Sequence, residues 1–191
     1  MSNSRPIGVF DSGIGGLTVV KALRDRLPNE TIVYLGDTAR VPYGPKSPET
    51  VQRYAEELAH MLMKKNTKAL VVACNTVSSV ALPLLTRKFS VPVIGVIEPG
   101  ARAALKATRN QYVGVIGTRA TIRSGAYEKA LHATDNNVRV SSRACPLLVP
   151  LIEEGLLNDD VTDRVILRYV EPLIGDGISA PCAGAPRATI V

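Results

Sequence analysis

The stretch Ile7-Gly8-Val9-Phe10-Asp11-Ser12-Gly13-Ile14-Gly15-Gly16 sets the interpretation of the whole sequence. Its first four residues are apolar and predict a buried strand, and the glycine-rich turn leads into an amphipathic pattern over residues 17–27. Short apolar runs alternate with longer amphipathic segments along most of the chain, which is typical of βαβ units. We therefore predict an α/β fold with parallel sheets.

The apolar runs and capping residues place the other elements. Further strands are predicted over residues 31–35, 69–73, 91–97, 112–116 and 138–141, and a late helix over 162–173. Ser47-Pro48 predicts the start of a helix, because serine caps helices and proline is tolerated in the first turn. The apolar face of this helix is expected to carry Val51, Tyr54, Leu58, Met61 and Leu62.

A weak internal repeat predicts two domains. The pattern Gly8-Val9-Phe10-Asp11 recurs as Gly114-Val115-Ile116-Gly117, at an offset of 106 residues. We predict a first α/β domain over residues 1–97 and a similar, incomplete second domain over 98–178, with a hinge at Glu98-Pro99-Gly100. Residues 179–191 depart from the repeat, because two prolines stand where a buried strand is expected.

Composition excludes several classes of protein. An apolar share of 46% in 191 residues is too high for global disorder, and 3 cysteines are too few for a disulfide scaffold. No apolar run approaches a membrane span and no signal peptide begins the chain, so we expect a cytoplasmic protein without a membrane partner. The net charge of +6 is scattered, with 6 Tyr, 2 Phe and no Trp, so nucleic-acid binding is not predicted.

Polar residues follow the carboxyl ends of the predicted strands, where ligands of parallel α/β sheets collect. Residues 11–16 offer a carboxylate, a hydroxyl and backbone N–H groups at a helix start, which suits an anion. The alternative is a plain glycine turn in which Asp11 caps the helix. The candidate binding residues are Asp11, Ser12, Tyr43, Gly44, Asn75 and Thr76.

Cys74 is the candidate catalytic residue. One interpretation is a small buried apolar side chain at a strand end. The other is a reactive thiol, because Asn75 and Thr76 place Cys74 at a helix start, where the helix dipole lowers a thiol pKa. Cys145 precedes a proline and is interpreted as structural. His60 and His132 have no Cys, Asp or Glu at ligand spacing, so no metal site is predicted.

Together these motifs resemble the glutamate racemases of the aspartate/glutamate racemase superfamily. The matching stretches are residues 8–16, Asp37-Thr38-Ala39-Arg40-Val41-Pro42-Tyr43-Gly44 and Val72-Ala73-Cys74-Asn75-Thr76, with weaker matches at Gly117-Thr118, Thr121 and from Cys145 to Glu153. The resemblance covers roughly residues 5–178. It implies two similar α/β domains with the substrate bound between them.

The resemblance also implies roles for individual residues. Cys74 would be one of two opposed thiol bases, assisted by Asp11, that interconvert L- and D-glutamate without a cofactor for peptidoglycan synthesis. Ser12, Tyr43, Gly44, Asn75 and Thr76 would hold the substrate. Thr118 and Thr121 would contribute from the second domain, with Glu153 supporting the opposite side. A homodimer is left open by the resemblance, and some relatives of this family inhibit DNA gyrase.

The chain departs from the family pattern in its tail. The family's second motif, Leu-Gly-Cys-Thr-His-Tyr-Pro-Leu, is replaced by Ala183-Gly184-Ala185-Pro186-Arg187, and Cys182 lacks its Thr-His neighbours. We expect a truncated or frame-shifted racemase, since a shifted reading of the tail can encode the spacing of Leu-Gly and Pro-Leu. Two further hypotheses stay open: an inactive module that binds a dicarboxylic amino acid or a protein, and a racemase acting on aspartate or a related acid.

Overall fold

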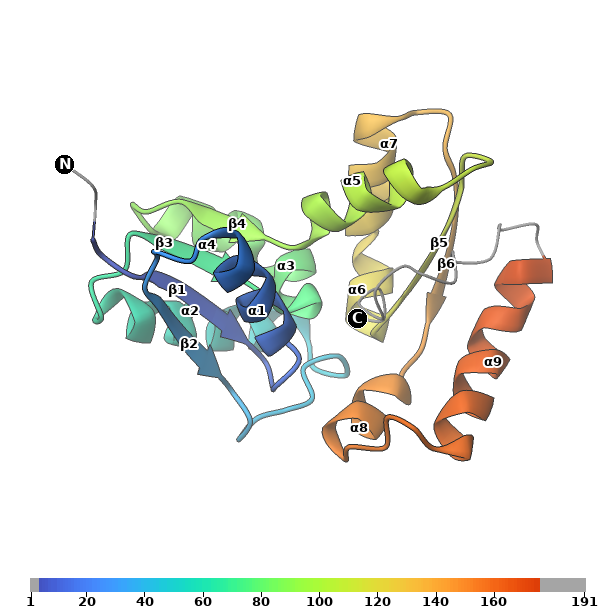
Figure 1. The fold of residues 1–191 in the computed structure, drawn as a ribbon, viewed down its shortest axis with the longest axis horizontal. Helices are drawn as coiled ribbons and strands as arrows, with labels where there is room; N and C mark the ends of the chain where they lie inside the picture. Colours follow the sequence, from blue (N-terminus) through green and yellow to red (C-terminus); the bar gives the residue numbers. More distant parts are fainter. Residues whose placement is uncertain (1–3, 176–191) are drawn as a thin grey trace. The chain divides into compact units, whose positions relative to one another are not determined.

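The computed structural model describes residues 4–175. The chain forms two compact units, and the boundary between them in the sequence lies between Val96 and Ile97. The sequence pattern had placed this boundary after residue 97. The first unit contains β1 (Ile7–Asp11), α1 (Leu17–Arg26), β2 (Ile32–Gly36), α2 (Pro48–Met63), β3 (Ala69–Val72), α3 (Asn75–Val80), α4 (Leu82–Lys88) and β4 (Val93–Gly95), as Figure 1 shows.

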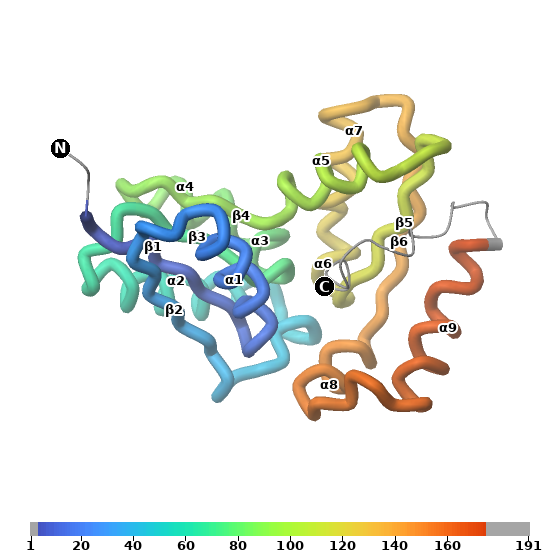
Figure 2. The backbone as a smooth tube through the Cα atoms, viewed as in Figure 1, coloured from blue at the N-terminus to red at the C-terminus, as the bar shows by residue number. Residues whose placement is uncertain are grey.

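The first unit is built on a parallel sheet in the order β2-β1-β3-β4. Because β1 lies in the middle, Phe10 pairs with Leu35 of β2 on one side and with Val72 of β3 on the other. Figure 2 traces how the chain returns through a helix between one strand and the next. The predicted α/β class with parallel sheets is confirmed.

Alternate residues of the central strands face opposite layers of helices. Val9 and Val71 pack against apolar side chains of α1. Phe10 and Val72 belong to the larger core on the other face, which is completed by α2, α3 and α4. Burial on both faces explains why the strands read as continuous apolar runs.

The helix α2 begins as predicted, with Ser47 as the N-cap and Pro48 in the first turn. The Thr50 backbone N–H donates to the Ser47 hydroxyl at 3.3 Å. One expectation was wrong: Met61 is 51% exposed, whereas Leu62 is 1% exposed. The buried stripe follows the helical period through Val51, Ala55, Leu58, Ala59 and Leu62, and residue 61 lies outside it.

The second unit contains α5 (Ile97–Ala107), β5 (Tyr112–Gly117), α6 (Arg119–Ser124), α7 (Ala126–Thr134), β6 (Arg139–Ala144), α8 (Leu148–Glu153) and α9 (Asp160–Gly175). Its strands β5 and β6 are parallel. Val113 and Val115 of β5 form a small core with Ala101 of α5 and Leu131 of α7. The parallel pairing continues the βαβ pattern of the first unit. In the described residues this second sheet has two strands, whereas the sheet of the first unit has four.

The predicted hinge at Glu98-Pro99-Gly100 was wrong, because these residues form the first turn of α5. Proline is accepted there, since the first N–H groups of a helix have no intrahelical acceptor. A Cβ atom on Gly100 would approach the Tyr127 hydroxyl to 3.0 Å. This glycine therefore serves the close packing of α5 on α7.

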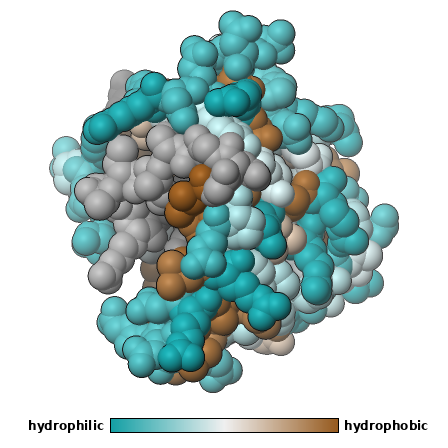
Figure 3. Space-filling view, turned by 90° about the vertical axis from the view of Figure 1, so that its right-hand side faces the viewer, coloured by the Kyte–Doolittle hydropathy of each residue, from teal (hydrophilic) through white to brown (hydrophobic). Residues whose placement is uncertain are grey.

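The C-terminal part of the second unit, from residue 147 onward, has several large apolar side chains at the surface. Apolar patches interrupt the hydrophilic surface on the face shown in Figure 3. Between positions 147 and 174, the exposed large apolar residues are Leu147, Leu156, Leu157, Val161, Leu167 and Ile174. Within residues 4–175, no helix combines the length and apolar composition that a membrane crossing requires. The expectations for Cys182 and residues 179–191 lie outside the described residues.

The neighbouring residues Leu62 and Met61 provide a matched test of the α2 packing. Leu62→Ala is expected to lower the free energy of unfolding by about 2–5 kcal/mol, because it opens a cavity in the core. Met61→Ala is expected to change it by less than about 1 kcal/mol. Urea unfolding followed by circular dichroism measures both, and equal losses would contradict the observed orientation of α2.

Candidate functional site

The turn after β1 is organised by the Asp11 carboxylate, which is 7% exposed. Asp11 Oδ2 accepts hydrogen bonds from the backbone N–H groups of Gly13 at 3.0 Å and Gly16 at 3.1 Å. Gly16 is the N-cap of α1, so Asp11 stabilises both the turn and the start of the helix. The capping role that the sequence left open therefore exists, and it fixes the backbone beside Ser12.

The close approach within this turn requires glycine at position 16. A Cβ atom there would lie 2.6 Å from Asp11 Cβ and 3.0 Å from Ala73 Cβ. On the β2 side, the Tyr34 hydroxyl donates to the Gly13 carbonyl at 2.8 Å. The turn is thus held between the ends of β2 and β3.

Cys74 lies at the carboxyl end of β3 and is the N-cap of α3. The Ala73 backbone N–H donates to the Phe10 carbonyl at 2.9 Å, which aligns the end of β3 with the end of β1. The Cys74 thiol donates to the Ser12 hydroxyl at 3.3 Å. Asn75 and Thr76, in the first turn of α3, are both buried. Asp11, Ser12 and Cys74 therefore converge at one edge of the sheet, as parallel strands favour.

The expected lowering of the Cys74 pKa was wrong for this structure. Burial and, second to it, the negative charge of Asp11 together raise the pKa of the thiol to about 11. Hydrogen bonds from Ser12 and from the backbone act in the opposite direction but are weaker. The helix α3 spans only 6 residues and Cys74 is 5% exposed, so desolvation of the thiolate outweighs the helix dipole.

Tyr43 and Gly44 are both buried, in the loop between β2 and α2. Tyr43 belongs to the same apolar cluster as Cys74, and its hydroxyl donates to Asp37 Oδ2. Burial and the Asp37 carboxylate raise the pKa of Tyr43 above its ordinary range, so the phenol stays protonated. Asp37 also accepts from Arg40 Nε at 2.7 Å. Asp37 and Arg40 are part of a quoted motif, but the sequence had assigned them no role.

The second unit brings together the two threonines named from the sequence. Thr118 is the N-cap of α6, and its hydroxyl lies 3.0 Å from that of Thr121. Cys145 is buried after β6, and its backbone N–H donates to the Gly117 carbonyl at 2.8 Å. Glu153 is the last residue of α8 and is half-buried. Within this unit, Thr118 and Cys145 both follow carboxyl ends of paired strands.

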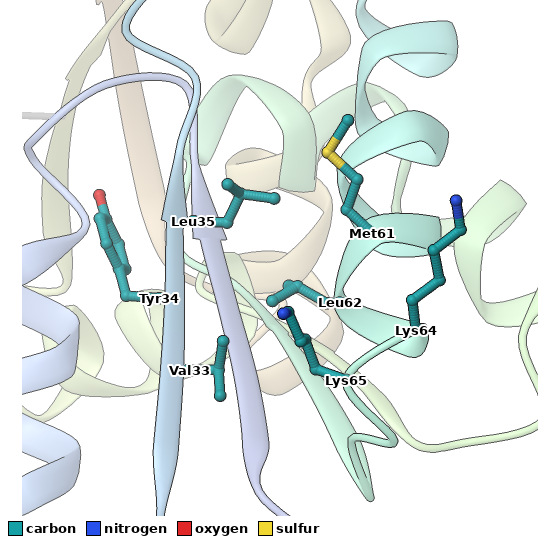
Figure 4. Close-up of a pocket in the computed structure, with 7 residues that line it drawn as sticks. All are labelled: Val33, Tyr34, Leu35, Met61, Leu62, Lys64 and Lys65. Carbon is teal, nitrogen blue, oxygen red and sulfur yellow. The ribbon is translucent and has the colours of Figure 1, made fainter.

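A separate cavity of about 430 Å³ lies between β2 and α2. Figure 4 shows Val33 and Leu35 on the side of β2 that faces α2, with Tyr34 pointing the opposite way. The cavity is lined in part by Lys64 and Lys65 and by none of the candidate site residues. In residues 4–175, no group of three or more His, Cys, Asp or Glu side chains is arranged to hold a metal ion.

Comparison with known proteins identifies the family. The model of the Asp/Glu/Hydantoin racemase family matches residues 17–186. The chain therefore belongs to the Asp/Glu/Hydantoin racemase family, a class of isomerases.

Several relatives at about half identity are named glutamate racemase. The glutamate racemase of Neisseria meningitidis is 48% identical over 185 residues, which cover 96% of this chain and 68% of that protein. A glutamate racemase structure from Bacillus anthracis is 46% identical with a TM-score of 0.86, covering 90% of this chain and 65% of that one. A structure from Francisella tularensis, in complex with D-glutamate, is 43% identical with a TM-score of 0.84, over 92% and 66%. The chain thus spans about two thirds of the length of these relatives.

The charge of Asp11 provides a test of the Cys74 environment. Asp11→Asn is expected to lower the thiol pKa from about 11, because it removes a negative charge that disfavours the thiolate. Ser12→Ala is expected to raise the pKa, because it removes a hydrogen bond that stabilises the thiolate. The pH dependence of Cys74 alkylation, followed by peptide mass spectrometry, measures both.

The control for this titration is Asp25→Asn, which removes an exposed carboxylate from α1. It is expected to leave the Cys74 pKa unchanged. A pKa in Asp11→Asn equal to that of the unmodified chain would contradict the electrostatic role of Asp11.

Gly15 and Gly16 form a matched pair for the packing of the turn. Gly16→Ala is expected to cost about 1–3 kcal/mol of unfolding free energy, because the added methyl group overlaps Asp11 and Ala73. Gly15→Ala is expected to cost less, since its Cβ atom would lie 3.8 Å from Asp11 Oδ2. Urea unfolding compares the two, and an equal or smaller loss for Gly16→Ala would argue against this packing.

Proposed function

We propose that the chain interconverts L- and D-glutamate by proton transfer at Cα without a cofactor, with Cys74 as one of two opposed thiol acid–base groups. The observation that carries this proposal is the hydrogen bond between the Cys74 thiol and the Ser12 hydroxyl, beside the buried Asp11 carboxylate. Relatives named glutamate racemase at about half identity support glutamate as the substrate.

The residues around Cys74 suit an amino acid with two carboxylates. A Cα–H next to a carboxylate is very weakly acidic, so its removal needs a base held against it. Asp11 and Ser12 offer acceptors for an ammonium group, and Asn75 and Thr76 offer donors for a carboxylate. The Tyr43–Gly44 turn completes the set of binding residues on the first unit.

Inversion requires a second group on the opposite face of Cα. By resemblance to the family, this group is a second thiol, with Thr118, Thr121 and Glu153 on the side of the second unit. The biological role proposed is the supply of D-glutamate for peptidoglycan in the cytoplasm. A homodimer stays a prediction, as do a role at DNA gyrase and the lack of a nucleic-acid partner.

A second candidate is a module that binds a dicarboxylic amino acid without catalysis. The observation in its favour is the burial of Cys74 beside the Asp11 carboxylate, which raises the thiol pKa to about 11 and keeps the thiol protonated near neutral pH in the unliganded site. Such a thiol binds a ligand beside it but does not accept a proton. Measurements of proton exchange and of ligand binding separate the two candidates.

The deciding experiment incubates the chain with L-glutamate in D2O and follows two signals, loss of the Cα proton and appearance of D-glutamate. A racemase gives both, and Cys74→Ala is expected to abolish both because it removes the acid–base group. The matched control is Cys145→Ala, which removes a buried thiol outside the first unit.

Three other results would each change the proposed function. Exchange without D-glutamate would mean that Cys74 acts alone on one face of Cα. Binding of glutamate by calorimetry with neither signal would favour the binding module. Activity on L-aspartate but not on L-glutamate would change the proposed substrate from glutamate to aspartate.

A further inference from the structure

The loop between β2 and α2 is anchored by a buried carboxylate. Asp37 follows β2 directly and is 8% exposed. Its backbone N–H donates to the Asp11 carbonyl at 3.0 Å, so the loop begins beside the turn that carries Ser12. A buried carboxylate is stable only when it is hydrogen-bonded or paired.

The partners of Asp37 come from the loop itself. Its Oδ2 atom accepts from the Tyr43 hydroxyl and from Arg40 Nε. Arg40 is fixed in turn by α2, because its Nη1 atom donates to Glu57 Oε2 at 2.5 Å and its guanidinium lies 4.0 Å from the centre of the Tyr54 ring. These contacts link the loop to the middle of α2.

The orientation of the Tyr43 hydroxyl limits what it can do for a ligand. Tyr43 is 1% exposed, and its hydroxyl donates to Asp37. A phenol has one O–H donor, so Tyr43 cannot also donate a hydrogen bond to the carboxylate of a ligand. A carboxylate bound at the Tyr43–Gly44 turn would therefore take its hydrogen bonds from backbone N–H groups, whose position depends on the tether of the ring.

We propose that Asp37 is a positioning residue: with Arg40, it holds the Tyr43 side chain as a tether that fixes the Tyr43–Gly44 backbone for binding a carboxylate of the ligand. The identity of the ligand as glutamate rests on the proposed function. The tether itself rests on the hydrogen bonds of Asp37 and on the burial of Tyr43.

The first test needs no ligand. The Lys46 backbone N–H donates to the Tyr43 carbonyl at 3.0 Å and reports opening of the loop by amide hydrogen exchange. Asp37→Asn and Tyr43→Phe are each expected to accelerate exchange at Lys46 by about tenfold, because hydrogen bonds to a charged group are the stronger ones. The Ala73 amide, bonded to Phe10 within the sheet, is expected to keep its rate.

The second test measures the affinity for D-glutamate by calorimetry. Each single variant is expected to raise Kd by about tenfold. The double variant is expected to raise Kd by about the same factor, because both substitutions break one tether. Glu56→Gln is the control, since it removes an ion pair of α2 with Lys88 outside this network and is expected to change neither measurement.

Each contrary outcome has a distinct meaning. Unchanged exchange at Lys46 in both variants would overturn the tether, and equal acceleration at Ala73 would make Asp37 a general stabilising residue instead. Additive losses of affinity in the double variant would show that the Tyr43 hydroxyl contacts the ligand directly, which also overturns the inference. If the unmodified chain binds no glutamate, the proposed function fails, and the exchange result alone decides the tether.

Discussion

Asp11 is the last residue of β1, and its carboxylate accepts hydrogen bonds from two backbone N–H groups of the following turn. This arrangement explains why position 16 is glycine, since the backbone must pass within contact of the Asp11 and Ala73 side chains. It also sets the place of Ser12 opposite Cys74. The charge that stabilises the turn is the same charge that raises the pKa of the thiol, so structure and reactivity are coupled at this residue.

Residues of β2 and of the loop that follows it donate hydrogen bonds to the end of β1 and its turn. The Tyr34 hydroxyl and the Asp37 backbone N–H both donate to carbonyls of the β1 turn, those of Gly13 and Asp11. The loops that follow β1 and β2 are therefore joined directly, and the β3 end is joined to them through Ser12 and Cys74. Parallel strands bring these loops to one edge, and the hydrogen bonds between them keep the polar side chains in fixed positions.

The sequence was sufficient to predict features that depend on local pattern. The alternation of apolar runs and amphipathic segments gave the parallel α/β class, and Ser47-Pro48 gave the start of α2. The convergence of Asp11, Ser12 and Cys74 followed from their positions at strand ends. The first two signals lie within a few residues of the feature that they predict, and the third rests on the rule that parallel strands end at one edge of a sheet.

Features that depend on partners far away in the sequence were missed, or, for the Cys74 pKa, predicted to shift in the wrong direction. The Cys74 pKa depends on how completely the thiol is buried, which no local motif reports. Arg40 is fixed by Glu57, seventeen residues away on another element. Gly100 was assigned to a hinge, but its small size serves the contact with Tyr127 on α7. In each case tertiary packing overrides the local signal.

The raised pKa of Cys74 places a requirement on any proton transfer at this site. A thiol with a pKa of about 11 is a proton donor near neutral pH, and it becomes a base only when the thiolate is stabilised. An ammonium group bound beside Asp11 would offset the negative charge that now disfavours the thiolate, and hydrogen bonds from the backbone near Val77 already favour it. The substrate of an amino-acid racemase carries such an ammonium group. Under the proposed function, binding of the substrate would thus lower the pKa of the Cys74 thiol, whereas the unliganded site would keep this thiol protonated near neutral pH.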